Sequence, residues 1–106
     1  MSTKNKLSYS VADQRYWDKQ MKELTFGRTI RAYRLCEDWS LTEAAEKIGI
    51  GIQQLSDYEH GRKLPSIERA YSIAKALGMM PQAVVIQLLN EQLHRAEIPF
   101  QVDLVA

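Results

Sequence analysis

The side chains that could carry out covalent or acid–base chemistry are few in this sequence and far apart. Cys36 is the only cysteine, and the two histidines, His60 and His94, are distant from each other in the chain. Glu59 has no nucleophile or second carboxylate at a spacing that would support catalysis. There is no Cys/His cluster with metal-ligand spacing and no glycine-rich phosphate loop after a strand. The sequence therefore predicts no enzyme, no metal site and no cofactor.

Length and composition set further bounds. A chain of 106 residues fits one domain with an appended element, and a single cysteine excludes an internal disulfide. No apolar run reaches the roughly 20 residues needed to span a bilayer, and no apolar stretch of a signal peptide follows residues 1–6. We therefore expect a cytoplasmic protein with no membrane partner. A net charge of +1 gives no overall basic signature of the kind many nucleic-acid binders show.

The N-terminal segment divides into two parts. The first seven or so residues are polar and basic without periodicity, which is typical of disorder. Ser10, with Asp13 three residues on, then begins a helical pattern. The apolar stripe of that pattern is predicted to pack on its own domain or to contact a second protein, and it consists of Trp17, Met21 and Leu24.

Two short helices joined by a glycine turn are predicted over residues 41–59, which is the pattern of a helix-turn-helix unit. Ser40 and Glu43 form a capping box that starts the first helix, and Gly49 allows the positive φ of the turn. Small alanines would let the second helix cross closely over the first, and Leu55 would fill the angle between them. The outward face of residues 52–57 is then left projecting from the surface.

Three further helices and one strand complete the prediction. The apolar spacing indicates helices over residues 26–36, 66–77 and 81–93. Apolar residues at every second position from 98 to 104 indicate a strand, and no other strand is expected in the chain. The predicted fold class is all-α: a five-helix bundle with an extra N-terminal helix and a short C-terminal β-strand used in dimerisation.

The segment from Phe26 to Gly78 resembles the lambda-repressor/Cro-like (XRE) helix-turn-helix family of DNA-binding transcriptional regulators. The resemblance covers half of the chain and leaves residues 1–24 and 81–106 outside it. It implies a DNA-binding domain at 25–80, an N-terminal extension at 1–24 and a dimerisation element at 81–106. The residues that carry it include Gly27, Ile30, Arg31, Arg34, Trp39, Ser40, the run Glu43–Gly49, Leu55, Ser56, Tyr58, Glu59, Gly61, Pro65, Ser66, Ala74, Leu77 and Gly78.

The resemblance implies that the start of the second short helix reads bases in the major groove of double-stranded DNA. The implied base-contacting residues are Ile52, Gln53, Gln54, Ser56 and Asp57. Gln53 suits a bidentate contact to adenine, Ile52 can pack on a thymine methyl, and Asp57 can accept from a cytosine amine. The alternative for the glutamines is that they are plain solvated side chains.

The resemblance also implies phosphate anchors and one structural ion pair. Ser40 with the neighbouring backbone amides would hold one phosphate, and His60, Arg62 and Lys63 would hold another. Arg34 and Glu59 would tie the first helix of the domain to the end of the recognition helix. The sequence departs from the family at Leu41, where glutamine is common, and at Gly51, where serine or threonine is common.

A monomer with so few phosphate ligands would bind DNA weakly, so we expect a homodimer whose recognition helices lie about 34 Å apart. The apolar face of residues 82–93 and the unpartnered strand 98–104 are the expected dimer surface. The predicted function is a sequence-specific transcriptional regulator that acts as a repressor. The alternatives are an antitoxin, whose toxin-binding segment would contain Tyr16, Trp17 and Met21, and a protein-only interaction module. The operator, the regulated genes and any effector cannot be deduced.

Overall fold

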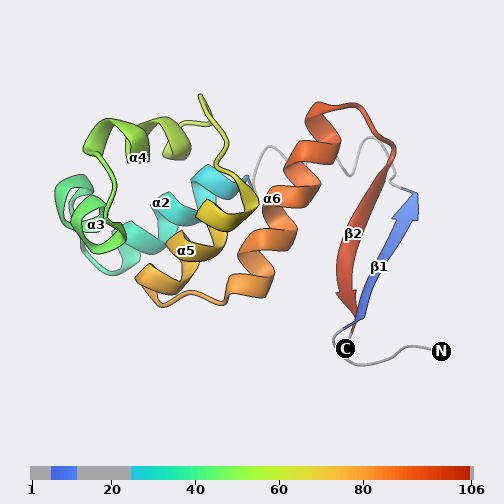
Figure 1. The fold of residues 1–106 in the computed structure, drawn as a ribbon, viewed down its shortest axis with the longest axis horizontal. Helices are drawn as coiled ribbons and strands as arrows, with labels where there is room; N and C mark the ends of the chain where they lie inside the picture. Colours follow the sequence, from blue (N-terminus) through green and yellow to red (C-terminus); the bar gives the residue numbers. More distant parts are fainter. Residues whose placement is uncertain (1–5, 12–24, 106) are drawn as a thin grey trace.

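Helices dominate the computed structural model, which describes residues 6–11 and 25–105 (Figure 1). Within these residues α2, α3, α4 and α5 form a compact group, α6 runs along its side, and a two-stranded sheet stands beyond α6. The bounds are β1 (Lys6–Val11), α2 (Phe26–Cys36), α3 (Leu41–Ile48), α4 (Ile52–Glu59), α5 (Ile67–Leu77), α6 (Pro81–Arg95) and β2 (Phe100–Val105). The five predicted helices of the body are all confirmed.

Local sequence signals fix the ends of these helices. At α3 the Ser40 hydroxyl accepts from the Glu43 amide at 3.0 Å, and the Glu43 carboxylate accepts from the Ser40 amide at 2.9 Å, which is the predicted capping box. Gly49 ends α3 with φ of 86°, a conformation that a side chain would strain. The Ser66 hydroxyl likewise caps α5 by accepting from the Arg69 amide at 3.1 Å, without the reciprocal side-chain bond of the capping box. Residues at the helix ends themselves therefore fix where α3 begins and ends and where α5 begins.

A single apolar core joins all five helices. Leu55 of α4 and Ala44 of α3 are fully buried, and Ala45 of α3 is only 1% exposed. The remaining core residues come from α2, α4, α5 and α6 and are Phe26, Ile30, Tyr58, Ala70, Ile73, Ala74, Leu77, Val84 and Leu88. A Cβ on Gly27 would lie 2.1 Å from the Tyr58 carbonyl oxygen, so glycine is needed where α2 meets the end of α4. Helix α4 thus packs on a well-ordered apolar core.

Helix α6 belongs to this same body. Val84 and Leu88 lie in the shared core, and Glu91 accepts a hydrogen bond from the Phe26 amide at 2.9 Å. That bond satisfies one of the amides that every helix N-terminus leaves open, here at the start of α2. The expected boundary at residue 81 therefore divides elements that share one core. None of the helices in residues 25–105 is long and apolar enough to cross a membrane.

The sheet corrects three expectations about the chain ends. β1 pairs with β2 in antiparallel register, from Lys6 opposite Val105 to Val11 opposite Phe100. The prediction that no second strand exists is therefore wrong, as are disorder at residues 6–7 and a helix start at Ser10. The alternation of polar and apolar residues in Lys6–Val11 is short, and such a segment becomes a strand only because β2 supplies a partner. The helix expected over residues 12–24 lies outside the described residues.

Asn90 attaches the sheet to α6. Its side-chain Nδ2 donates to the Val102 carbonyl oxygen at 2.9 Å, and its Oδ1 accepts from the Val102 amide at 2.7 Å. The strand lies between α6 and β1 (Figure 1). This side-chain amide does what a neighbouring strand would do at that point, so β2 is held on both sides. Pairing of β2 with β2 of a second copy, as expected from the sequence, is therefore replaced by pairing within the chain.

Candidate nucleic-acid interface

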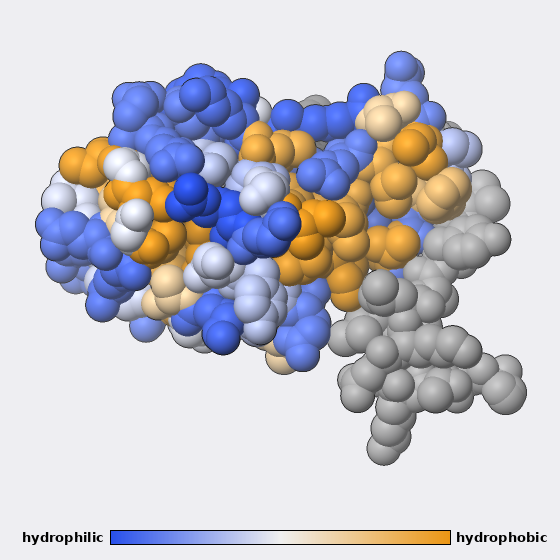
Figure 2. Space-filling view, in the orientation of Figure 1, coloured by the Kyte–Doolittle hydropathy of each residue, from blue (hydrophilic) through white to orange (hydrophobic). Residues whose placement is uncertain are grey.

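The outward face of α4 is polar and accessible. Ile52 is 49% exposed, Gln53 is exposed, and Gln54 and Ser56 are half-buried. In Figure 2 the surface around α4 is hydrophilic, whereas the side of the molecule formed by α6 and β2 is largely apolar. The structure thus brings four of the five predicted base-contacting residues to one open face. Asp57, the fifth, is buried on the same helix.

Asp57 is the centre of a hydrogen-bond and ion-pair cluster. Its Oδ1 accepts from Gln53 Nε2 at 3.0 Å and from Arg62 Nε at 2.8 Å, while Lys63 Nζ lies 3.8 Å from Oδ2. The hydrogen bonds from Arg62 and Gln53 and the two nearby positive charges lower the pKa of Asp57 below its ordinary value. With two hydrogen bonds to Oδ1 and the Lys63 ammonium near Oδ2, Asp57 is better suited to position its neighbours than to contact a cytosine.

Gln53 is oriented by this cluster. Because Asp57 can only accept while ionised, it fixes which end of the Gln53 amide carries the nitrogen. The amide oxygen and one N–H remain available, and these are the acceptor and donor that a bidentate contact to adenine requires. Sequence spacing could have indicated the contact between Gln53 and Asp57, since residues four apart on a helix are neighbours.

Arg62 lies against α4 rather than free in its loop. Its Nε donates to Asp57, and its Nη2 donates to the Ser56 hydroxyl at 3.1 Å. The backbone repeats the connection, since the Arg62 amide donates to the Asp57 carbonyl oxygen at 2.9 Å. Half of the side chain stays exposed, and the hydrogens on Nη1 point to no acceptor among the described residues. The guanidinium is therefore held ready for an external acceptor.

His60 follows α4 and is exposed. Its Nδ1 lies 2.8 Å from the Ser56 carbonyl oxygen, a contact that requires a proton on Nδ1. In the neutral ring Nε2 would then be an acceptor. A phosphate contact through Nε2 consequently needs the doubly protonated, positively charged ring.

The N-terminus of α3 supplies the other expected phosphate anchor. The Ser40 hydroxyl and the Ser40 amide are both used in the capping box. The Glu43 carboxylate that closes the box has a lowered pKa, because it accepts hydrogen bonds from the Ser40 backbone and side chain. Two acceptor groups, the Ser40 hydroxyl and the Glu43 carboxylate, thus lie at this helix end. Because an acceptor does not bind an anion, the anion site depends mainly on the remaining backbone amides.

The expected ion pair between Arg34 and Glu59 is present beneath α4. Arg34 Nε and Nη2 donate to the two Glu59 oxygens at 2.7 and 3.0 Å, a bidentate arrangement. Arg34 Nη1 also donates to the Trp39 carbonyl oxygen at 3.0 Å. The Glu59 carboxylate raises the pKa of Arg34. One side chain thus connects α2, the end of α4 and the loop that enters α3.

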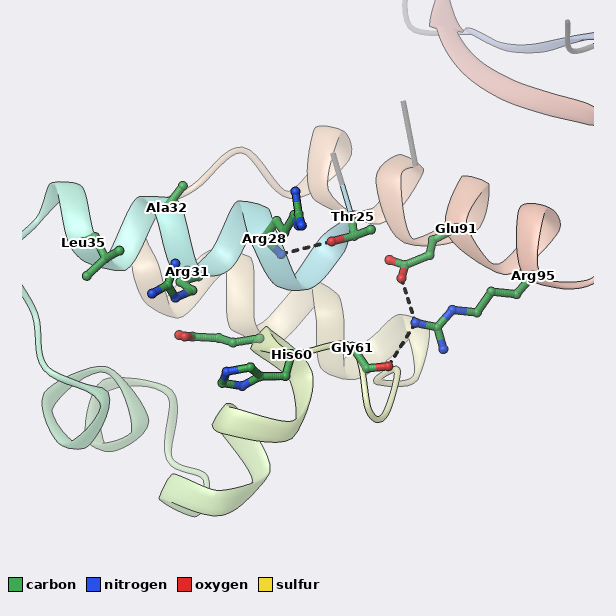
Figure 3. A pocket seen from close by; sticks show the side chains of 10 residues that line it. Thr25, Arg28, Arg31, Ala32, Leu35, His60, Gly61, Glu91 and Arg95 are labelled. Carbon is green, nitrogen blue, oxygen red and sulfur yellow. Dashed lines mark hydrogen bonds and ion pairs between the residues drawn. The ribbon is translucent and has the colours of Figure 1, made fainter. Parts of the chain in front are cut away.

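A cleft of about 900 Å³ lies beside this pair, between α2, the end of α4 and α6 (Figure 3). Its two carboxylates are occupied: Glu59 binds Arg34, and Glu91 binds Arg95 at 3.0 Å. Arg95 also donates to the Gly61 carbonyl oxygen at 3.1 Å and so connects α6 to the loop that carries Arg62. Sequence reasoning missed this connection, because Gly61 and Arg95 are distant in the chain.

No other cluster among the described residues offers different chemistry. No group of His, Cys, Asp and Glu in residues 6–11 and 25–105 has the arrangement of a metal site. Cys36, the one cysteine, is exposed at the end of α2. The candidate site is therefore the outward face of α4 together with the loop that follows it.

Comparison with known proteins agrees with this geometry. Residues 30–81 match a family model described as helix-turn-helix. Among solved structures, the chain is similar to one described as the master regulator for biofilm formation SinR in complex with DNA. The two share 29% sequence identity over 57% of this chain and 98% of that chain, with a TM-score of 0.53. A search among curated proteins gave no match.

These findings establish the class of the protein. The order of the helices, the glycine turn and the family match agree with one another along residues 30–81. The chain contains a helix-turn-helix domain of the lambda-repressor/Cro-like (XRE) family of transcriptional regulators.

Proposed function

We propose that this chain is a sequence-specific DNA-binding transcriptional regulator that docks α4 in the major groove and acts as a repressor by occupying its operator. The observation that carries the proposal is the outward face of α4 with the loop that follows it, where Gln53 and Arg62 are exposed and are both oriented by Asp57. Preorganised donors lose less conformational entropy on binding, which favours recognition over random contact. The similarity to a regulator solved in complex with DNA supports the same conclusion.

Base reading is assigned to the exposed start of α4. Gln53 would contact an adenine through its amide, and Ile52 would pack on a thymine methyl. Gln54 Nε2 donates to the Tyr58 hydroxyl at 3.0 Å, so its amide oxygen and its second N–H are left for a base. Ser56 already accepts from Arg62 and would contribute through its own hydroxyl hydrogen.

Phosphate binding is assigned to the two ends of the helix-turn-helix. Arg62 and Lys63 are exposed and would contact the DNA backbone after α4, joined by His60 when its ring is charged. Ser40 and the amides of α3 would contact the backbone on the other side of the groove. Asp57 balances part of the positive charge, and the chain has a net charge of only +1. We therefore propose that a homodimer, which doubles the contacts, is the DNA-binding form.

The experiment is fluorescence anisotropy of a labelled random-sequence duplex with the full chain, at rising salt. We expect binding at low salt that weakens as salt rises, because phosphate contacts release counterions. A matched pair of variants, Arg62→Gln on the proposed face and Arg69→Gln on α5, separates local contact from overall charge. Equal weakening by both variants would argue against the assigned face. Absence of binding at low salt would favour a protein-only interaction module.

A further inference from the structure

The sheet has two outer edges, and they differ. The outer edge of β2 is closed by α6, because Asn90 takes both the amide and the carbonyl of Val102. The Phe100 amide on the same edge donates to the Ile98 carbonyl oxygen at 3.0 Å. In Figure 1 the outer edge of β1 faces away from α6 and from the helical body. Among the described residues, this edge has no covering element.

The register identifies the backbone groups that line the open edge. In an antiparallel pair, residues alternate between those whose N–H and C=O point at the partner strand and those whose groups point away. Val102 points away from β1, because Asn90 binds it, and Tyr9 lies opposite Val102. The backbone N–H and C=O of Tyr9 therefore point away from β2. Because backbone direction alternates along a strand, the backbone groups of Leu7 and Val11 point to the same outer edge.

We propose that this edge pairs with the same edge of a second copy of the chain. The two β1 strands would run antiparallel about a two-fold axis at Tyr9 and join the two sheets into one of four strands. This proposal rests on the homodimer of the proposed function and supplies its surface. An exposed row of unpaired backbone groups is a template for another strand, and proteins rarely leave it open.

A second copy fits this edge better than an unrelated strand. Each copy has a single open edge, so one symmetric pairing covers the edges of both copies and closes the assembly. Two open edges in each copy would instead lead to fibres. Centring the pairing on Tyr9 places Leu7 opposite Val11, so that all three outward-facing residues are paired.

Proline substitution tests the pairing without DNA, so its outcome is independent of DNA binding. Tyr9→Pro removes the amide hydrogen at the centre of the proposed interface. The monomer should tolerate this change, because proline is accepted on an edge strand where the N–H faces outward. Tyr9→Ala keeps that N–H and is the matched control for loss of the side chain.

Sedimentation equilibrium of the full chain is the measurement. We expect a dimer for the wild type and for Tyr9→Ala, and at least a tenfold rise in the dimer dissociation constant for Tyr9→Pro with unchanged circular dichroism. Ser8→Pro, which removes an N–H that faces β2, should instead disturb the sheet within each monomer. A wild-type chain that stays monomeric, or a Tyr9→Pro chain that dimerises as tightly as the wild type, would overturn the proposal.

Disulfide cross-linking in a Cys36→Ser background tests the register. Facing residues in a hydrogen-bonded antiparallel pair have Cα atoms about 5.5 Å apart, within the range that a disulfide spans. Tyr9→Cys should therefore cross-link to its symmetry mate. Leu7→Cys alone should not, whereas Leu7→Cys combined with Val11→Cys should. Equal cross-linking by the single Leu7→Cys variant would contradict a register centred on Tyr9.

Discussion

The inner and outer sides of α4 carry two ion pairs that differ in their surroundings. On the inner side, Glu59 and Arg34 form a bidentate pair whose side chains are 1% and 10% exposed. On the outer side, Asp57 is 11% exposed, but its partner Arg62 is 51% exposed. The two carboxylates are only two residues apart on one helix. The inner pair is buried, whereas the outer pair has one buried partner, Asp57, and one exposed partner, Arg62.

The difference indicates different roles for similar chemistry. The buried pair contributes to the packing of α2 on α4, and loss of one partner leaves the other charge buried. An ion pair with an exposed partner contributes little to stability. Its geometric effect remains, because it holds Arg62 and Gln53 in place for an external ligand. The inner pair should therefore affect folding and the outer pair should affect DNA binding.

The largest expected effect is on the inner pair. Glu59→Ala should lower the free energy of unfolding by about 3–5 kcal/mol, because it leaves the buried Arg34 guanidinium without its partner. Urea denaturation followed by circular dichroism measures this loss. The double variant Arg34→Met with Glu59→Met should lose much less, since both charges are removed together. A loss below about 1 kcal/mol for Glu59→Ala, as at a surface pair, would remove the distinction between the two sides.

The next effect concerns Asp57. Asp57→Asn should lower stability only slightly but weaken DNA binding about tenfold, or roughly 1.4 kcal/mol, because a neutral amide oxygen holds Arg62 and Gln53 less firmly than the ionised carboxylate does. Removing a negative charge near DNA would by itself strengthen binding, so the two effects have opposite signs. Anisotropy titration measures the change, with Glu68→Gln on α5 as the control for charge. Stronger binding by Asp57→Asn would contradict the positioning role.

The lowered pKa of Asp57 gives a smaller, pH-dependent effect. A carboxylate with a lowered pKa in the native state adds stability above its unfolded-state pKa, about 3.9, and this stability is lost as the pH falls through the native value. The difference in denaturation midpoint between the wild type and Asp57→Asn should therefore be constant near neutral pH and shrink only in strongly acidic solution. A difference that already disappears between pH 7 and pH 5 would contradict this account.

The smallest effect is predicted at Gly51. This residue precedes α4 without a side-chain cap, its φ is −72°, and an added Cβ would meet no atom within 4 Å. Gly51→Ser should therefore stabilise the chain by a few tenths of a kcal/mol and tighten DNA binding slightly through one added hydroxyl. Gly51→Ala supplies the Cβ without the hydroxyl and is the matched comparison. If Ala and Ser behave alike, capping has no part in the effect.

Much of the helical body could be predicted from the sequence because its signals are local. The capping box at Ser40, the positive φ at Gly49 and the burial of Leu55 depend on residues close together in the chain. The strand β1 could not be predicted, because its partner lies at the other end of the chain. The contact of Asn90 with Val102, 12 residues along the chain, could not be predicted either, because it depends on how β2 folds back along α6.

Within the candidate site, the sequence predicted position better than role. It placed Gln53 on the exposed face of α4 and Arg62 in the loop after it, and the structure agrees with both placements. It assigned Asp57 to base contact, whereas the structure shows a side chain occupied by Gln53, Arg62 and Lys63. Side-chain partners across a helix end depend on how the loop folds back, which spacing alone does not determine.

The central claim is that the outward face of α4 reads DNA sequence while its flanking loop holds the backbone. The most direct test is to select a preferred duplex from a random library and titrate all its single-base variants with wild type, Gln53→Ala and Arg62→Ala. Gln53→Ala should lose discrimination at one base pair, about 1–3 kcal/mol, while Arg62→Ala should weaken every duplex alike and reduce the salt slope by about one. Unchanged binding and specificity in both variants would contradict the claim.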